Sequence, residues 1–217
     1  VAKRRSSIDY EEHIFDTLPN QGKWTEEEYL RPTDSTNRLV EFTDGFLEPL
    51  PMPTDKHQIV LKWLFFAFHA FVAPRGGIVQ FTVLRLQLRA GKYREPDLLL
   101  LLDANDPRRQ DRYWIGADLL AEVVSKDKPS RDLVLKKREY AQAGIPEYWI
   151  VNPLNETVIV YRLNGERYVR HGLFRRGQKA TSALLSGFAV DVSPLFDADR
   201  WKSVELPSWL CVTLSSI

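Results

Sequence analysis

The sequence predicts an α/β protein in which helices flank a mixed central β-sheet, with an N-terminal helix and a β-hairpin added to it. Three observations predict this class. Residues 97–102 and 119–124 are apolar along almost their whole length, as expected of strands covered on both faces. Residues 60–72 carry apolar side chains at helical spacing. A second helical pattern, 131–143, separates the 119–124 segment from another apolar strand, 147–152.

Composition narrows the class of protein further. The 217 residues suit one domain with extensions, and a content of 44% hydrophobic and 27% charged side chains argues against general disorder. The formal net charge is +1, so any surface that binds nucleic acid has to be local. Cys211 is the single cysteine, which excludes an intramolecular disulfide, argues against a thiolate zinc site and suits a reducing compartment.

Neither export nor membrane insertion is indicated. Residues 1–19 contain basic side chains but no apolar stretch after them, unlike a secretory signal. The most apolar helical stretch, 63–73, is well short of the roughly 20 residues that span a bilayer. We therefore expect a cytoplasmic protein without a membrane segment.

The N-terminal elements carry local signals. Thr25-Glu-Glu-Glu28 has the form of a capping box, in which a hydroxyl and a carboxylate satisfy free backbone amides, and it predicts a short helix near 26–31. Asp44-Gly45 lies between the segments 38–43 and 46–49. Because this dipeptide readily takes the positive φ values of a tight turn, the two segments are predicted to form a β-hairpin.

A long helix is predicted after the hairpin. Pro51 and Pro53 interrupt the chain, and Thr54 or Asp55 can cap the helix that follows. Its apolar positions are Val60, Leu61, Leu64, Phe65, Phe68, Phe71 and Val72. The segment 74–77 ends the helix, whose apolar side is expected to pack on the sheet.

The remaining pattern is that of strands. Residues 84–89 alternate leucine with polar side chains and predict a half-exposed strand. The buried strand 147–152 is expected to pair with 157–161 after a turn. Residues 168–169 and 188–192 are expected to form further strands that close the sheet.

Two acids stand inside the apolar strands. An ionised carboxylate in such a place costs several kcal/mol unless a metal, a hydrogen-bond network or a counter-charge compensates it. On adjacent strands Asp97 and Glu122 could converge at one end of the sheet, and two hard oxygen ligands suit Mg²⁺. The alternative for Asp97 is a turn cap after Pro96, whereas a structural role for Glu122 is harder to find because its neighbours are apolar.

The helix predicted over 131–143, with Ser130 as its cap, would bring the cation Lys136 toward the two acids. Asp132, Lys136 and Tyr140 are spaced four residues apart and lie on roughly one face. The Lys136 ammonium could reach the metal edge, orient water or stabilise phosphate charge. The alternative is an ordinary solvated lysine on an amphipathic helix.

A set of short motifs, in the same order along the chain, resembles the Uma2 family, also described as a domain of unknown function. The motifs are Trp24-Thr-Glu-Glu-Glu-Tyr29, Glu41-Phe-Thr-Asp-Gly45, His57, Glu95-Pro-Asp97, Ala121-Glu-Val-Val-Ser125, Asp132-xxx-Lys136-xxx-Tyr140 and Gly144-Ile-Pro-Glu-Tyr-Trp-Ile-Val-Asn-Pro153. The resemblance covers roughly residues 22–193. It leaves 1–21 as an N-terminal extension and 194–217 as a C-terminal extension.

The resemblance implies a restriction-endonuclease-like fold of the PD-(D/E)XK superfamily. It implies that Asp97 and Glu122 ligate Mg²⁺, with Mn²⁺ as the alternative ion, for hydrolysis of a phosphodiester. Val124 occupies the place of the superfamily's lysine, two residues after Glu122, and Lys136 from the next helix would substitute for that lysine in space.

Two further residues would lie at the edge of such a site. Glu41 belongs to the hairpin motif and His57 begins the long helix. Their alternatives are an outward-facing strand residue and a helix-terminal side chain with a partly buried ring. Tyr140, Tyr148 and Trp149 are interpreted as core or wall residues.

The function expected from these residues is that of a Mg²⁺-dependent endonuclease acting on DNA. A metal-bound water would attack phosphorus in line while Lys136 orients that water or offsets developing charge. A homodimer would be natural for an enzyme that cuts both strands of a duplex. One alternative is a non-catalytic nucleic-acid-binding or interaction protein on the same fold, and a more distant one is a metal-dependent hydrolase of a small phosphoester.

Overall fold

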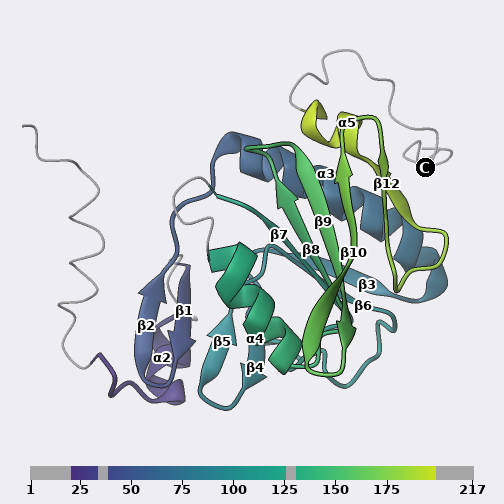
Figure 1. The fold of residues 1–217 in the computed structure, drawn as a ribbon. Coiled ribbons are helices and arrows are strands. Elements are labelled where there is room, and N and C mark those ends of the chain that lie inside the picture. The colour runs from purple at the N-terminus through teal and green to yellow at the C-terminus, as the bar shows by residue number, and fades with distance from the viewer. Residues whose placement is uncertain (1–20, 34–38, 126–130, 199–217) are drawn as a thin grey trace, which may run out of the picture.

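The computed structural model describes residues 21–33, 39–125 and 131–198 (Figure 1). The elements in chain order are α2 (Glu26–Thr33), β1 (Val40–Thr43), β2 (Phe46–Pro49), α3 (Asp55–Val72), η1 (Ala73–Arg75), β3 (Ile78–Phe81), β4 (Leu86–Arg89), β5 (Lys92–Arg94), β6 (Leu98–Leu101), β7 (Leu119–Val123), η2 (Arg131–Lys136), α4 (Lys137–Gln142), β8 (Glu147–Asn152), β9 (Thr157–Asn164), β10 (Arg167–Arg175), β11 (Lys179–Thr181), β12 (Ala189–Asp191) and α5 (Val192–Phe196). In this part of the chain no helix has the length and apolar character needed to cross a bilayer.

The central sheet has six strands in the order β10-β9-β8-β7-β6-β3. It is mixed, because β7 and β8 run parallel while every other neighbouring pair is antiparallel. Two parallel neighbours need a crossover connection, and the η2 and α4 segment supplies it. The predicted mixed central sheet is therefore confirmed.

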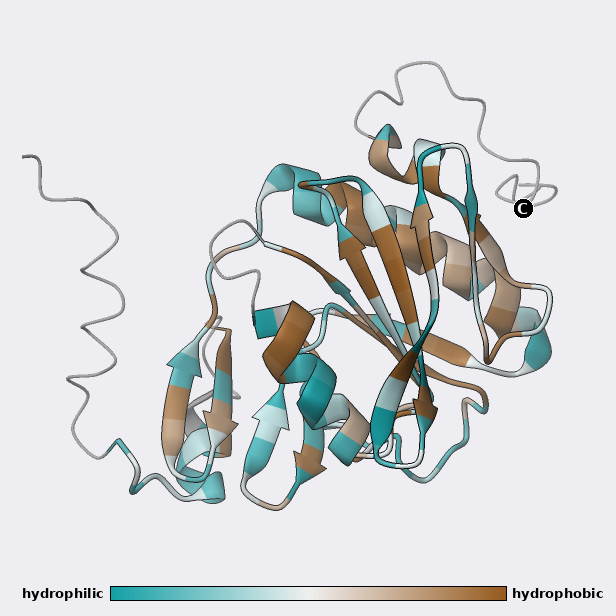
Figure 2. Ribbon diagram, viewed as in Figure 1, coloured by the Kyte–Doolittle hydropathy of each residue, from teal (hydrophilic) through white to brown (hydrophobic). Residues whose placement is uncertain are grey.

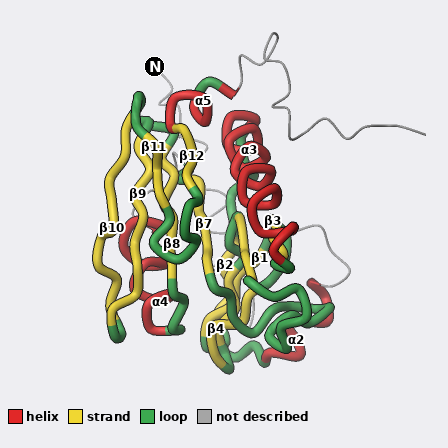
Figure 3. Tube along the Cα trace, turned by 90° about the vertical axis from the view of Figure 1, so that its right-hand side faces the viewer, coloured by secondary structure: helices red, strands yellow, loops and turns green. Residues whose placement is uncertain are grey.

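Different helices cover the two faces of this sheet. Successive side chains of a strand point to opposite faces. On β7, Ala121 and Val123 pack in the cluster that contains α3, whereas Leu120 packs in the cluster that contains Tyr140 of α4, as does Val124 just after the strand. Figure 3 shows the two helices on opposite sides of the strands, and Figure 2 shows hydrophobic residues concentrated on α3 and on the strands beside it.

A second sheet of four strands, β2-β1-β5-β4, stands beside the first and carries the N-terminal helix. Its core is aromatic. Tyr29 of α2 stacks on Phe42 of β1 with ring centroids 5.1 Å apart and lies 5.4 Å from the ring of Tyr93 in β5. The Tyr29 hydroxyl also donates a 2.9 Å hydrogen bond to the Val40 carbonyl. These contacts hold α2 and the hairpin as one unit.

The local signals near the N-terminus produce the expected elements. Thr25 Oγ1 accepts from the Glu28 amide at 3.2 Å, and Glu28 Oε2 accepts from the Thr25 amide at 2.8 Å, which is the predicted capping box. Asp44 and Gly45 take φ values of 47° and 89° in the hairpin turn. Thr54 caps α3 by accepting from the His57 amide at 3.3 Å.

Two strand predictions need correction. Residues 188–192 do not close the central sheet, since β12 pairs with β11 in a separate two-stranded sheet. The strand predicted over 84–89 begins only at Leu86 and pairs with β5 in the second sheet. Arg85 also breaks the expected alternation, because it is 9% exposed and so buried among the residues around it.

The helix predicted over 131–143 is present in two parts, a π-helical segment η2 and a regular α4. The proposed cap, Ser130, lies outside the described residues. Gly144 follows α4 with a φ of 75°, the left-handed conformation that favours glycine at a helix end. The π-helical turn matters for the cleft described below, because it changes which side chains share a face.

Burial in the central sheet predicts a large difference between two leucines near the end of one strand. Leu100 is fully buried and Leu102 is 45% exposed. Leu100→Ala should lower the free energy of unfolding by about 2–5 kcal/mol, because it removes buried methyl groups and leaves a cavity. Leu102→Ala is the matched control and should cost well under about 1 kcal/mol. Equal losses for the two variants in urea denaturation would contradict the burial pattern.

Candidate active site

Asp97 and Glu122 lie opposite one another at one end of the central strands β6 and β7. The antiparallel register of β6 and β7, continued by one residue, puts Asp97 opposite Glu122. Leu99 and Leu120, two residues away on their strands, pack in the cluster on the α4 side of the sheet. Because side chains alternate between faces, both carboxylates point to that same side.

Asp97 is held by three groups from different parts of the chain. Its Oδ2 accepts a 2.8 Å hydrogen bond from the Val123 amide and lies 3.1 Å from Nε2 of His57. Its Oδ1 is 3.4 Å from the Thr82 hydroxyl, a long contact. Because Val123 follows Glu122 on β7, the hydrogen bond from its amide holds the Asp97 carboxylate beside Glu122. The position of this carboxylate therefore depends on the pairing of β6 with β7.

Glu122 is buried and is contacted from the crossover segment. Its Oε1 accepts a 2.9 Å hydrogen bond from Nζ of Lys136 and a 2.6 Å bond from the Tyr140 hydroxyl. Burial and the Glu122 charge raise the pKa of Tyr140 well above its ordinary value, so the phenol keeps its proton and donates. The Lys136 side chain is 5% exposed, which contradicts the interpretation as a solvated lysine.

A second group of acids faces the first from the hairpin side. Glu41 is fully buried, and Glu95 is 5% exposed. Burial alone would raise the pKa of Glu41, but Lys136, Arg131 and Arg94 hold it below the ordinary value. Burial, assisted by the Glu41 charge, raises the pKa of Glu95 to about 8. Glu41 is therefore ionised at neutral pH and Glu95 is largely protonated.

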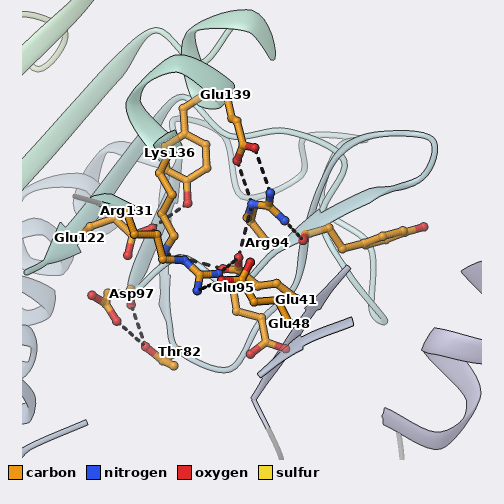
Figure 4. Close-up of polar contacts among 12 residues, drawn as sticks. Glu41, Glu48, Thr82, Arg94, Glu95, Asp97, Glu122, Arg131, Lys136 and Glu139 are labelled. Carbon is orange, nitrogen blue, oxygen red and sulfur yellow. Dashed lines mark hydrogen bonds and ion pairs between the residues drawn. The ribbon is translucent and has the colours of Figure 1, made fainter. Parts of the chain in front are cut away.

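Arg94 and Glu139 connect the second sheet to α4. Nε and Nη2 of Arg94 donate to the two oxygens of Glu139 at 2.8 and 2.9 Å, the bidentate geometry of a strong ion pair. Lys92 adds a 2.9 Å contact to Glu139. Arg94 also lies 3.3 Å from Glu41. In Figure 4 the pair lies on the Glu41 side of the site, with Arg94 between Glu139 and Glu41.

A cleft of about 350 Å³ opens beside Asp97 and Glu122. Its polar wall includes His57, Glu95, Asp97, Glu122, Arg131 and Lys136, and its apolar wall includes Leu50, Met52 and Leu154. Figure 4 shows Lys136 and Arg131 reaching between the Asp97–Glu122 side and the Glu41–Glu48 side. The cleft thus offers oxygen ligands, the cationic side chains of Lys56, Arg131 and Lys136, and an apolar rim in one place.

The donor set fits a magnesium-type ion. Among the described residues there is no group of three or more histidine, cysteine, aspartate or glutamate side chains that could hold a metal ion. Mg²⁺ commonly uses one or two carboxylates and completes its shell with water and substrate phosphate. Asp97 and Glu122 lie on one face of the sheet at one end of neighbouring strands, and they supply two carboxylates. A metal site built from protein ligands alone would need further side chains.

The structure brings together all five residues predicted from the sequence. Asp97, Glu122, Lys136 and His57 line the cleft, and Glu41 lies behind it, 3.7 Å from Lys136. The side chain of Asp132, which was expected on the same helix face as Lys136, lies outside the described residues.

Thr82 and Arg131 line the cleft but were not considered in the sequence analysis. Tyr140 was predicted to be a core or wall residue; it is fully buried in the core, and its hydroxyl also donates to Glu122. The spacing of Lys136 and Tyr140 did contain the signal for Tyr140, because a phenol one turn beyond the lysine reaches the same carboxylate. Thr82 and Arg131 carried no comparable signal.

The sheet order, the crossover helix and the acidic edge define an α/β protein with a restriction-endonuclease-like fold. The sequence profile of the Uma2 family, described as "Putative restriction endonuclease", matches residues 25–193. The chain therefore belongs to the Uma2 family.

A solved structure supports the fold. It is that of a protein from Anabaena variabilis described as a "putative nuclease belonging to DUF820". The two superpose with a TM-score of 0.64 at 19% sequence identity, covering 78% of this chain and 97% of that one. Among curated proteins no match was found.

The Glu122–Lys136 pair leads to a stability prediction. Lys136→Met should destabilise the fold by about 3–5 kcal/mol, because it leaves a buried carboxylate without its cation. The matched control is Lys137→Met, whose ammonium lies over the Tyr161 ring at 4.9 Å, and it should cost no more than about 1 kcal/mol. The double variant Glu122→Gln/Lys136→Met should lose less than the sum of the single losses in urea denaturation; additive losses would contradict the coupling.

Glu139 leads to a prediction about pH. Burial alone would raise its pKa, but Arg94 and Lys92 hold the pKa below the ordinary value of a glutamate. The folded-state pKa is thus lower than the unfolded one, so the stabilisation is complete above the unfolded pKa and is lost as pH falls through the folded pKa. The excess stability of the wild type over Glu139→Gln should therefore shrink as pH falls from about 7 to about 3. A difference that stays constant with pH in denaturant titrations would contradict the depressed pKa.

Proposed function

We propose that this protein is a metal-dependent endonuclease that hydrolyses phosphodiester bonds of DNA, with Mg²⁺ held by Asp97 and Glu122. The observation that carries the proposal is the meeting of these two carboxylates on one face of the sheet, in a cleft that also contains the Lys136 ammonium. Membership of a family described as "Putative restriction endonuclease" supports the same class of reaction. Mn²⁺ is the alternative ion, since it accepts the same oxygen ligands.

The ion, when bound, would supply a polarised water near neutral pH and would offset phosphate charge. The protein's own residues keep the ligands in place. His57 and Thr82 position Asp97 from the helix and loop sides, and Tyr140 positions Glu122.

Lys136 is the residue placed to act on the substrate. Its ammonium lies 2.9 Å from Glu122 and lines the cleft, so it can donate to an attacking water or to a phosphate oxygen beside the ligands. An ammonium offers three donors, which allows it to keep the Glu122 contact while it donates to a second group. This supports Lys136 as the counterpart of the lysine that is replaced by Val124 on the strand.

DNA is the substrate we favour over a small phosphoester. The apolar wall of Leu50, Met52 and Leu154 gives sugars and bases a surface to contact beside the polar edge. A homodimer would place two such clefts on a duplex, one for each strand. The Anabaena variabilis protein, described as a "putative nuclease", has the same fold.

One observation favours a second candidate, a nucleic-acid-binding protein that does not cleave. Each acid already has a compensating partner within the protein, Lys136 for Glu122 and His57 for Asp97, so neither needs a metal ion to be tolerated in the fold. Metal binding separates the two candidates. Titration calorimetry should detect a Mg²⁺ or Mn²⁺ site that Asp97→Asn removes, and the non-catalytic candidate would be preferred if no such site is found.

The nuclease proposal predicts the behaviour of two variants. Asp97→Asn and Glu122→Gln should each lower the rate of DNA cleavage with Mn²⁺ or Mg²⁺ by about 100-fold or more, since a lost ligand removes several kcal/mol of transition-state stabilisation. Chelation with EDTA should abolish cleavage by the wild type. Gel assays on single-stranded and double-stranded DNA and on RNA would measure this and test the preference for DNA.

Glu166→Gln is the control, because Glu166 is exposed in the turn between β9 and β10. It should cleave at the wild-type rate. Cleavage that persists in both ligand variants would point to a contaminating nuclease and would refute this active site.

A further inference from the structure

Two arginines contact Glu41, and they differ in how many of their N–H donors have hydrogen-bond acceptors within the protein. Arg94 is 3% exposed, and its guanidinium donates to Glu139, to the Thr43 hydroxyl and to the Phe42 and Tyr93 carbonyls. Its hydrogen-bonding capacity is used within the protein. Arg94 therefore has a structural role, connecting the second sheet to α4.

Arg131 is placed differently. Its side chain is 10% exposed and lines the cleft with Asp97 and Lys136. Nη2 donates to the buried Glu41, and Nη1 donates at 2.6 Å to Glu48. Its Nε is buried and has no hydrogen-bond partner in the part of the chain that the structure describes. A buried donor without an acceptor is unfavourable, and this guanidinium therefore has donor capacity that the described residues do not use.

The π-helical form of η2 explains why Arg131 shares the cleft with Lys136. Five residues make about 1.4 turns of an α-helix, which would turn the two side chains away from one another. A π-helix bonds residue i to residue i+5, so positions 131 and 136 stack along one side. The two cations consequently enter the cleft together, next to the acids (Figure 4).

The partners of Arg131 are also unequal. The Glu41 side chain is fully buried, whereas the Glu48 side chain is 42% exposed. Water can solvate Glu48 when its ion pair opens, so this contact is the weaker of the two. Glu41 thus anchors the guanidinium, and Glu48 occupies the Nη1 donor that a ligand could take over.

We infer that Arg131 binds a backbone phosphate of the nucleic acid, and that Glu48 is an internal competitor which the phosphate displaces from Nη1. A guanidinium holds its charge at every physiological pH and presents a planar set of donors that suits phosphate oxygens. This inference rests on the proposed function, because it concerns the polymer that enters the same cleft. It adds a substrate-binding residue beside the ligand pair and Lys136.

Binding of a fluorescent oligonucleotide in EDTA tests the inference, because no cleavage can occur. Arg131→Ala should weaken binding about tenfold and lower the slope of log Kd against log salt by about 1, as expected when one phosphate contact is lost. Arg131→Lys should recover part of the affinity. Glu48→Gln should tighten binding about twofold to fivefold, since the competing carboxylate has been neutralised.

A second carboxylate-paired arginine provides matched controls. Arg176 donates to Glu156 and Asp197 on the surface and does not line the cleft. Arg176→Ala and Glu156→Gln should leave affinity and salt slope at wild-type values. Thermal melting of every variant shows whether a change in affinity reflects a loss of folded protein.

The outcomes separate this inference from the proposed function. If Arg131 only bridges the hairpin and η2, Glu48→Gln will lower the melting temperature without tightening binding, and the inference fails. It fails equally if the wild type does not bind the oligonucleotide at low salt, or if it cleaves DNA while Arg131→Ala binds with unchanged affinity. Binding that depends on Arg131 in a protein that never cleaves would support the inference and refute the nuclease.

Discussion

Charged groups between the two sheets have to be compensated in a place that water hardly reaches, and this constraint shapes the rest of the structure. Glu41 and Glu122 are both buried, and each would cost several kcal/mol without a partner. Lys136 lies between them, 2.9 Å from Glu122 and 3.7 Å from Glu41. One ammonium thereby joins the central sheet to the hairpin, and the crossover segment that carries it is fixed by both.

The same compensation makes the site rigid. Asp97 accepts from a backbone amide of the neighbouring strand, so it cannot move without disturbing the pairing of β6 and β7. Arg94 and Glu139 hold the second sheet against α4 by a bidentate contact. The reaction proposed for this site would gain from such a frame, because residues that are already fixed in place need little reorganisation at the moment of reaction.

Local patterns predicted most of the elements, because the interactions that form them are local. The Thr25–Glu28 capping box, the Asp44-Gly45 turn and the apolar strands of the central sheet are each readable within a few residues. The prediction failed where pairing partners are distant. Residues 188–192 form a strand, but the sequence does not say that its partner is β11 instead of the central sheet.

The sequence by itself determined which residues are candidates for the site. A carboxylate in an apolar strand and a lysine at helical spacing from a tyrosine are visible without coordinates, since burial cost and helical period are properties of short segments. Only the tertiary structure decided that Asp97 and Glu122 share a face of the sheet at one end of its strands. It also decided that Glu95 lies beside Glu41 and that Arg131 lines the cleft together with Lys136. Those facts depend on strand register and on a π-helical turn, both of which are set by the packing of segments far apart in the chain.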